Sequence, residues 1–439
     1  MQRSVRKSGL VLERPASLSV AGPWRVKVQL AVRAARGVPR SVSALLAVAP
    51  PRSVTVTAEY HETLPLFNPQ AGGWRKGLAL NRLRAQECTT CHALDPASLR
   101  VCAGRGPGAR AFAAGKDWEA DLAWGTVGRL PEGGIGAAQP VFISYRYALL
   151  RLDTVVLTAA GKIVLRQGRP HNATPRPPRL LRGEIRLANI WVTSGLSRLT
   201  ADQLFPVLEA ALPEAAIPAA RSAEQLLPET MKKLCAGGAL RILAWGDSVT
   251  DGSYLPKPER DHWQAQFVRR LRQRFPRAVI ELITEAWGGY NSSSYLAEPP
   301  GSIHNYREKV LGARPDLIVS EFVNDAGMTP EDTARQYGRL LADFQAIGAE
   351  WIILTPHYVR GDWMGLKREK HIDADPRPYV AALRKFARAN RVALADAARR
   401  YGRLWRQGLP YSSLMMNNIN HPNPSGMRIF ADNLMALFP

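Results

Sequence analysis

Residues 240–252 read Leu-Arg-Ile-Leu-Ala-Trp-Gly-Asp-Ser-Val-Thr-Asp-Gly, an apolar run that stops in a small polar cluster. A continuous apolar run of this length is typical of a strand that is buried on both faces. Gly246 and Gly252 bracket a turn, and apolar residues then recur at helical spacing over residues 261–275. This order of strand, turn and helix places the Ser248 hydroxyl beyond the carboxyl end of a strand, where ligands collect in open α/β sheets. The alternative is that Ser248 only caps the start of a helix.

The second half of the chain repeats this alternation of strand and helix. Four further apolar segments predict strands, at residues 278–283, 316–320, 351–355 and 391–394. Helical patterns are found at residues 261–275, 303–311, 330–347, 378–390 and 424–437. Strands that alternate with helices predict an α/β fold, in which a parallel sheet of five strands carries helices on both faces.

The first half predicts short strands instead. These lie at residues 26–32, 54–60, 141–151, 154–157, 163–165 and 183–192, with a hairpin turn at residues 159–161. Four prolines make residues 168–178 a surface loop, because proline cannot sit inside a sheet. We therefore expect a β-rich, sandwich-like accessory domain at residues 1–212, a connector with a helix over residues 222–234 at 213–238, and an α/β domain at 239–439.

The net charge of +22 is unevenly distributed along the sequence. Residues 1–238 hold 32 Lys and Arg against 16 Asp and Glu, whereas residues 239–439 hold 27 against 21. The basic first half could bind an anionic polymer, because summed positive charge attracts polyanions. Since the basic residues are scattered singly, a solvated Arg-rich surface is the alternative.

The sequence predicts neither a membrane span nor an export signal. No segment approaches the roughly 20 apolar residues that a membrane span requires. The first residues are basic, as in a signal peptide, but Glu13 and Arg14 interrupt the apolar core that should follow.

Cysteine spacing raises a separate question. Cys88-Thr-Thr-Cys91-His92 matches the attachment pattern of c-type haem, although a second axial ligand is not evident. Together with Cys102, the same residues could hold a structural zinc ion. A disulfide between Cys88 and Cys91, or ordinary thiols, are simpler alternatives. The isolated Cys235 has no predicted role.

Three more polar clusters follow predicted elements of the second half. Residues 287–292 contain the pair Gly288-Gly289, residues 321–325 contain Asn324, and residues 418–426 contain His421. Ester hydrolysis needs a hydroxyl with a neighbouring base, together with donors directed at the oxyanion. A serine, a histidine, a glycine turn that exposes backbone N–H groups and a side-chain amide supply this set. This chemistry requires no metal and no cofactor.

These clusters, in this order, resemble the SGNH (GDSL) hydrolase family over residues 239–439. The resemblance implies a three-layer α/β/α fold of flavodoxin-like type with a parallel five-stranded sheet. It also implies that Ser248 is the nucleophile and His421 the general base. The implied oxyanion donors are the N–H groups of Ser248 and Gly289 and the side-chain amide of Asn324.

The sequence departs from the family pattern at two positions. Phe322 stands where the family has glycine, and Asn418 stands where it has the aspartate that orients the histidine. We expect Asn418 to act as a neutral acceptor for His421, with a backbone carbonyl or a carboxylate of Asp325, Asp373 or Asp396 as the alternative. The expected substrate-lining residues are Asp247, Trp287, Tyr290 and Phe322.

These observations predict a serine esterase that acts on small acyl esters through an acyl-enzyme. By analogy with family members that carry an added β domain, the expected substrate is acetylated carbohydrate. Four aromatic residues near strand ends could stack on sugar rings, namely Trp245, Trp287, Tyr290 and Trp363. The alternatives are a lipolytic esterase or thioesterase, and a polymer-binding protein whose hydrolase domain is degenerate.

Overall fold

The computed structural model describes residues 10–34, 37–209 and 223–439. It divides into two compact units, the first formed by Met1–Ala211 with Trp405–Ile419 and the second by Leu212–Leu404 with Asn420–Pro439. Most of the first half of the predicted connector, residues 213–222, lies outside the described residues. The rest forms two helices of the second unit, α2 (Ala223–Leu226) and α3 (Pro228–Ala236), and α3 packs against the first strand of its sheet.

The second unit is built on five parallel strands, as the sequence predicts. They are β18 (Ala239–Gly246), β19 (Val279–Ala286), β20 (Leu317–Glu321), β21 (Glu350–Leu354) and β22 (Ala393–Ala395). Their order in the sheet is β19-β18-β20-β21-β22, which is the flavodoxin-like order. Every residue of the central strand β20 is buried, which explains its continuous apolar pattern.

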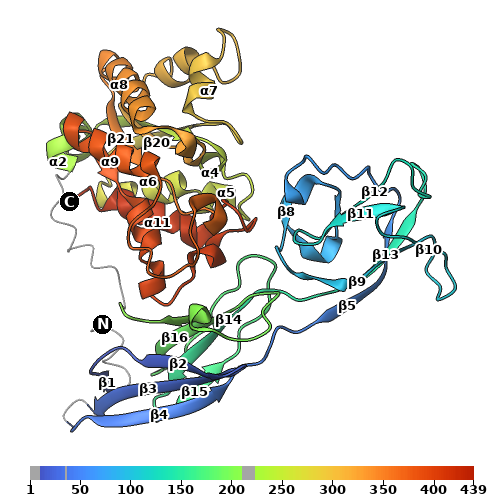
Figure 1. Cartoon of the computed structure of the whole chain (residues 1–439). Coiled ribbons are helices and arrows are strands. Elements are labelled where there is room, and N and C mark those ends of the chain that lie inside the picture. Colours follow the sequence, from blue (N-terminus) through green and yellow to red (C-terminus); the bar gives the residue numbers. More distant parts are fainter. Residues whose placement is uncertain (1–9, 35–36, 210–222) are drawn as a thin grey trace. The chain divides into compact units, whose positions relative to one another are not determined.

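Helices flank this sheet (Figure 1). The longer ones are α6 (Trp263–Arg274), α8 (Pro330–Ala346), α9 (Pro378–Asn390) and α11 (Pro424–Met435). α6 packs with α11, and α8 packs with α9. Shorter helices are α4 (Ser248–Asp251), α5 (Pro258–Asp261), α7 (Ser292–Ala297) and α10 (Ala397–Gly402). The helix expected at residues 303–311 is only a π-helical turn, Arg307–Leu311, and α7, which begins at a capping box on Asn291, was not predicted. No helix of the described ranges has the length and apolar character needed to cross a bilayer.

The first unit contains a sandwich of two antiparallel sheets. One sheet consists of β1 (Leu10–Leu12), β2 (Ser17–Gly22), β3 (Arg25–Ala34) and β4 (Arg40–Ala47); the other consists of β14 (Arg151–Leu157), β15 (Ile163–Arg166), β16 (Ile185–Val192) and β17 (Leu204–Pro206). Alternate residues of β3, from Val26 to Val32, are buried in the core that both sheets share. The predicted hairpin is present as β14 and β15, with Leu157 opposite Ile163.

A second hydrophobic core lies within the same unit. It is covered by the sheet β10-β9-β13-β5 and the sheet β11-β12-β6. These strands are β5 (Val54–His61), β6 (Leu78–Ala79), β9 (Leu94–Cys102), β10 (Ala111–Phe112), β11 (Trp118–Asp121), β12 (Thr126–Arg129) and β13 (Val141–Tyr147), and a small ladder joins β7 (Arg84–Ala85) to β8 (Cys88–Thr89). The β-rich character of the predicted accessory domain is confirmed, and the sandwich is accompanied by this second core.

The segment Trp405–Ile419 leaves the second unit and packs in the first. Ile419 is buried against Cys88 and Trp124, with Trp74 and Cys91 beside them. The side-chain amide of Asn189 donates to the Gly408 carbonyl at 2.6 Å. The first unit is therefore built from two separate stretches of sequence, although the sequence predicts one continuous domain over residues 239–439.

Cys88 and Cys91 belong to the hydrophobic cluster that contains Ile419. Cys88 is buried in β8, whereas Cys102 lies in β9 opposite Ala111 of β10. In the part of the chain that the structure describes, no three His, Cys, Asp or Glu side chains are grouped so as to hold a metal ion. The zinc grouping of Cys88, Cys91, His92 and Cys102 is therefore not formed; Cys88 and Cys91 share one hydrophobic cluster, whereas Cys102 lies in β9.

Candidate active site

The turn after β18 is held by a glycine and a buried aspartate. A Cβ atom on Gly246 would lie 2.2 Å from the Thr250 hydroxyl and 2.3 Å from the Glu321 carbonyl, so only glycine fits. Asp247 has no exposed surface; one carboxylate oxygen accepts the Val249 N–H and the other the Asn324 N–H, each at 3.0 Å. Asp247 therefore caps α4 and fixes the turn after β20, and it does not line the site as expected, because both its oxygens face backbone donors inside the protein.

Ser248 and His421 are brought together at this turn. Ser248 is the first residue of α4, and its Oγ lies 3.3 Å from the Nε2 of His421. His421 lies in the turn just before α11, which Asn423 caps by accepting the N–H groups of Ser425 and Gly426. Hydrogen bonds between a nucleophile and its base are often this long in the absence of substrate. The predicted nucleophile and base are thus neighbours despite a sequence separation of 173 residues.

The three expected oxyanion donors belong to loops that meet near Ser248. A Cβ atom on Gly288 would lie 3.7 Å from the Ser248 Cβ, and Gly289 has a left-handed φ of +84°. The side-chain amide of Asn324 donates to the Tyr290 carbonyl at 3.0 Å, and this bond connects the loop after β20 to the glycine turn. The second N–H of the same amide is not used in this bond. Among the described residues, the N–H groups of Ser248 and Gly289 have no acceptor.

Tyr254, which sequence reasoning missed, lies flat against His421. The two ring centroids are 4.2 Å apart and the ring planes differ by 2°. Such an overlay limits rotation of the imidazole, and the negative face of the tyrosine ring favours a positive charge on it. No local pattern marks this residue, since it lies in the loop between α4 and α5 and its partner is far away in sequence.

Three rings form a stack beside the glycine turn. Trp287 lies between Tyr290, at 3.6 Å, and His304, at 4.6 Å, with planes inclined by 18° and 19°. The Nδ1 of His304 lies 2.8 Å from a carboxylate oxygen of Glu285, which holds the end of the stack. Tyr290 is 46% exposed at the other end. Of the two expected aromatic residues in this stack, only Tyr290 keeps a ring face for a ligand, because Trp287 is covered by Tyr290 and His304.

Two other aromatic residues are placed differently from the expectation. Trp245 has no exposed surface, and Phe322 is only 2% exposed. Their rings meet edge to face at 4.8 Å beneath the site. Trp245 therefore cannot stack on a sugar, and Phe322, which directly follows β20, fills the core instead of lining the site.

Three buried carboxyl groups lie under the serine turn, on Asp247, Glu321 and Asp325. Asp325 accepts the Ser292 N–H at 3.0 Å, the Ser292 hydroxyl at 2.6 Å and the Tyr337 hydroxyl at 3.1 Å. Burial raises the pKa of Asp247 to about 7 and that of Asp325 to about 6. Burial, followed by the charge of Asp247, raises the pKa of Glu321 well above its ordinary value. Both Glu321 oxygens lack a hydrogen-bond donor among the described residues.

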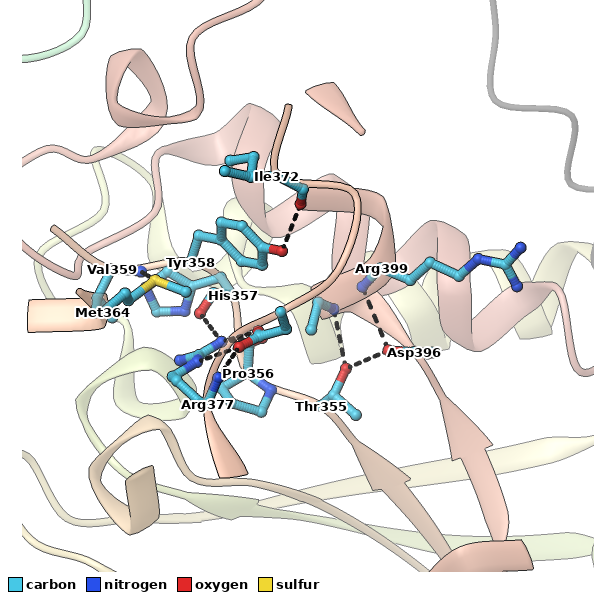
Figure 2. A network of polar contacts seen from close by, with 12 residues as sticks. Thr355, Pro356, His357, Tyr358, Val359, Met364, Ile372, Arg377, Asp396 and Arg399 are labelled. Carbon is cyan, nitrogen blue, oxygen red and sulfur yellow. Dashed lines mark hydrogen bonds and ion pairs between the residues drawn. The ribbon is translucent and has the colours of Figure 1, made fainter. Parts of the chain in front are cut away.

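The chain after β21 is anchored by a buried ion pair (Figure 2). Arg377 is paired with Asp375 at 2.6 Å and donates to the His357 carbonyl at 2.9 Å, while Tyr358 donates to the Ile372 carbonyl at 3.2 Å. His357 has no exposed surface, and burial together with the Arg377 charge lowers the pKa of its imidazole well below the usual value. The region beside β21 is therefore rigidly held and contains a neutral histidine.

Two of the groups expected to orient His421, Asp396 and Asn418, make other contacts. Asp396 is paired with Arg384 at 2.9 Å and accepts the Thr355 hydroxyl at 3.2 Å (Figure 2). Asn418, which belongs to the first unit, donates from its amide to the carbonyls of Asn172 at 3.1 Å and Thr89 at 3.3 Å. An orienting role for Asn418 stays a prediction.

The match to a known family concerns the second half of the chain. Residues 244–429 match the model of the GDSL-like lipase/acylhydrolase family. No curated protein matches the chain. A two-domain esterase (CEX) active on acetylated mannans has 18% identity and a TM-score of 0.40, and the match covers 50% of this chain and 53% of that one. The chain thus spans about half the length of that esterase.

Two further solved structures are matched almost over their full length. LAE5, an alpha/beta hydrolase from the metagenome of Lake Arreo, Spain, has 19% identity and a TM-score of 0.36, with coverage of 45% of this chain and 94% of that one. TesA has 18% identity and a TM-score of 0.34, with coverage of 45% and 97%.

Proposed function

We propose that this ester hydrolase, whose residues 244–429 match the model of the GDSL-like lipase/acylhydrolase family, works through a Ser248–His421 pair and removes acetyl groups from carbohydrate. The observation that supports the pair is the 3.3 Å approach of the Ser248 hydroxyl to the His421 Nε2. A serine hydroxyl is a weak nucleophile at its free pKa, and a base at this distance can activate it.

In the proposed reaction the Ser248 Oγ attacks the ester carbonyl while His421 Nε2 takes its proton. The tetrahedral oxyanion accepts hydrogen bonds from the N–H groups of Ser248 and Gly289 and from the Asn324 amide. His421 then gives the proton to the departing alcohol, which leaves an acyl group on Ser248. Water attacks this acyl-enzyme while His421 takes a proton from it, and His421 then returns this proton to the Ser248 Oγ as the carboxylic acid leaves.

The carbohydrate part of the proposal is supported by the stack of Trp287 and Tyr290. Tyrosine and tryptophan rings present a flat apolar face of the kind that packs on sugar rings. Tyr290 is about half exposed, and its carbonyl accepts from the Asn324 amide, one of the proposed oxyanion donors. A sugar on this ring would therefore lie next to the ester to be cleaved.

A substrate series tests this proposal with the full chain. Hydrolysis is measured on 4-nitrophenyl esters of increasing acyl length, and acetate release on acetylated xylan, chitin and pectin, with Ser248→Ala protein as the blank. We expect the acetyl ester to be the best nitrophenyl substrate and acetate to be released from at least one polymer. A rate that rises with acyl length, without acetate release, would instead support the lipolytic alternative.

We expect Tyr254→Leu to lower kcat/KM by about tenfold, because the imidazolium loses the ring face that favours its charge. The acid limb of the pH profile should move to lower pH, since it reports protonation of the general base. Tyr254→Phe keeps the ring and should retain both the rate and the profile. The check is kcat/KM for 4-nitrophenyl acetate across pH. An equal loss in the Phe and Leu variants would exclude a role for the ring face.

Asn418→Ala should cost about tenfold in turnover if a neutral acceptor orients His421, since one orienting hydrogen bond is worth roughly 1 kcal/mol. Because its amide also donates to Thr89 and Asn172, turnover must be measured together with thermal unfolding. Asn418→Asp cannot donate to these carbonyls and should melt at lower temperature. A loss in Asn418→Ala as large as in His421→Ala would argue against the neutral acceptor, whereas a gain in Asn418→Asp would indicate triad geometry.

A further inference from the structure

Four arginine side chains line one pocket of about 510 Å³ in the second unit. Arg260 comes from α5, Arg269 and Arg270 from α6, and Arg428 from α11. The three helices pack on one another, so guanidinium groups from separate elements converge on one concave surface. This differs from the first half of the chain, where the basic residues are scattered singly.

The positive charge of this arginine pocket is only partly neutralised. Arg260 is bound through two nitrogens by Asp261, at 2.8 and 3.0 Å, and Arg270 is paired with Asp432 at 2.5 Å. Arg269 donates only to the Arg260 carbonyl, at 3.3 Å. Arg428 has neither an ion pair nor a hydrogen bond with any residue that the structure describes. Two guanidinium groups thus face the pocket without a carboxylate.

The start of α11 also borders the pocket, but its backbone is already occupied. Pro424 has no N–H, and the side chain of Asn423 accepts the N–H groups of Ser425 and Gly426. An anion in the pocket would therefore be held by guanidinium groups, with the exposed Ser425 hydroxyl as an additional donor. The planar fork of arginine binds carboxylate, sulfate and phosphate oxygens in pairs, which suits this arrangement.

The pocket lies next to the segments that carry the catalytic pair. α11 begins directly after the His421 turn. Arg260 and Asp261 are followed by His262, and the ring of His262 packs against Gly252 at the end of α4. A Cβ atom on Gly252 would lie only 2.4 Å from this ring. The pocket is therefore lined by residues that directly follow the two segments that carry Ser248 and His421.

We propose that the arginine pocket is a binding site for an oxyanion group, such as the carboxylate of an acidic sugar or a free phosphate or sulfate ion. The binding site itself does not depend on the reaction. Its use as a subsite for acidic substrate rests on the proposed function.

Binding is tested on full-length Ser248→Ala protein by titration calorimetry at constant ionic strength. The probes are inorganic phosphate, sulfate and trigalacturonate, with xylotriose as the neutral counterpart and chloride as the background ion. The pocket variant is Arg269→Gln with Arg428→Gln. The matched control is Arg274→Gln with Arg388→Gln, which removes the same charge from exposed positions outside the pocket.

We expect the pocket variant to bind the anionic probes at least about tenfold more weakly, and the control variant to bind like the parent. Tighter binding of trigalacturonate than of the inorganic ions would assign the site to an acidic sugar, and the reverse would assign it to a free ion. Absence of binding by every anion, or equal weakening in the control, would overturn the proposal.

Kinetics then test the link to the substrate in the active enzyme. The pocket variant should raise KM for acetylated pectin about tenfold while KM for acetylated xylan stays unchanged. Because calorimetry uses an inactive protein, anion binding without this KM effect would refute only the subsite role. Failure of all hydrolysis would refute the proposed function and leave the binding site standing.

Discussion

Ser248→Ala and His421→Ala should each lower turnover of 4-nitrophenyl acetate by about 10⁴-fold or more. The hydroxyl and the imidazole lie 3.3 Å apart, and groups that act as a unit lose nearly all of their effect when either is removed. The measurement is the steady-state rate of purified full-length variants, together with their thermal unfolding. The double variant should be no slower than either single one, because both changes remove the same step.

Ser253→Ala is the matched control for this prediction. Ser253 follows the same turn, is exposed and donates only to Asp251, so its removal should leave the rate nearly unchanged. A Ser248 or His421 variant that keeps more than about a tenth of the wild-type rate, with wild-type folding, would end the assignment of this pair.

Glu321→Gln should stabilise the protein, with the largest gain at alkaline pH. The carboxyl group is fully buried, both of its oxygens lack a donor among the described residues, and burial raises its pKa well above 4.5. The folded state therefore holds a proton that the unfolded chain has already lost at higher pH. Because the unfolded state then binds fewer protons, the free energy of unfolding falls as pH rises above about 4.5. Glutamine has nearly the same shape and cannot ionise.

The expected rise in melting temperature is about 3 °C or more at pH 8 and close to zero at pH 4, measured by calorimetry. Glu331→Gln makes the same chemical change at an exposed position and should show no such pH dependence. A gain that is equal at both pH values would mean that the ionisation of Glu321 is not the cause.

Other buried groups should also make the wild-type protein less stable as pH rises above about 4. The pKa of Asp247 is raised from 3.8 to about 7 and that of Asp325 from 3.8 to about 6, so each group removes stability as pH rises between these two values. The lowered pKa of His357 acts in the opposite direction, since the unfolded chain binds a proton there as pH falls below 6.5. Glu321→Gln should therefore make the loss of stability with rising pH less steep.

The sequence predicted the α/β half well because its signals are local. An apolar run of strand length needs no knowledge of its neighbours, and β18 to β22 all lie within a few residues of the predicted segments. The Ser248 and His421 motifs were recognised for the same reason. Tyr254 was missed because its stacking on His421 produces no recognisable pattern in the sequence around either residue. The burial of Asp247 and Phe322 was missed because the motif gives their position but not the direction of their side chains.

The division of the chain was harder to predict. Residues 405–419 contain tryptophan, tyrosine and methionine, which fit a helical domain as well as any other. Only the fold shows that Ile419 is buried against Cys88 and Trp124 of the first unit. Likewise, the alternation in residues 26–32 and 54–60 predicts strands, but not that these strands belong to separate cores.

The return of Trp405–Ile419 to the first unit sets the order in which the protein can fold during synthesis. Domains usually fold in turn as they leave the ribosome, the N-terminal one first. Here the first unit lacks Trp405–Ile419 until residue 419 has emerged, so the side chains of Cys88 and Trp124 are without Ile419 while the five strands of the second unit are synthesised. α11, the last helix of the second unit, is synthesised only after Trp405–Ile419. Ribosomes stalled just before residue 405 should therefore carry a first unit that proteases cut more readily than one stalled well beyond residue 419.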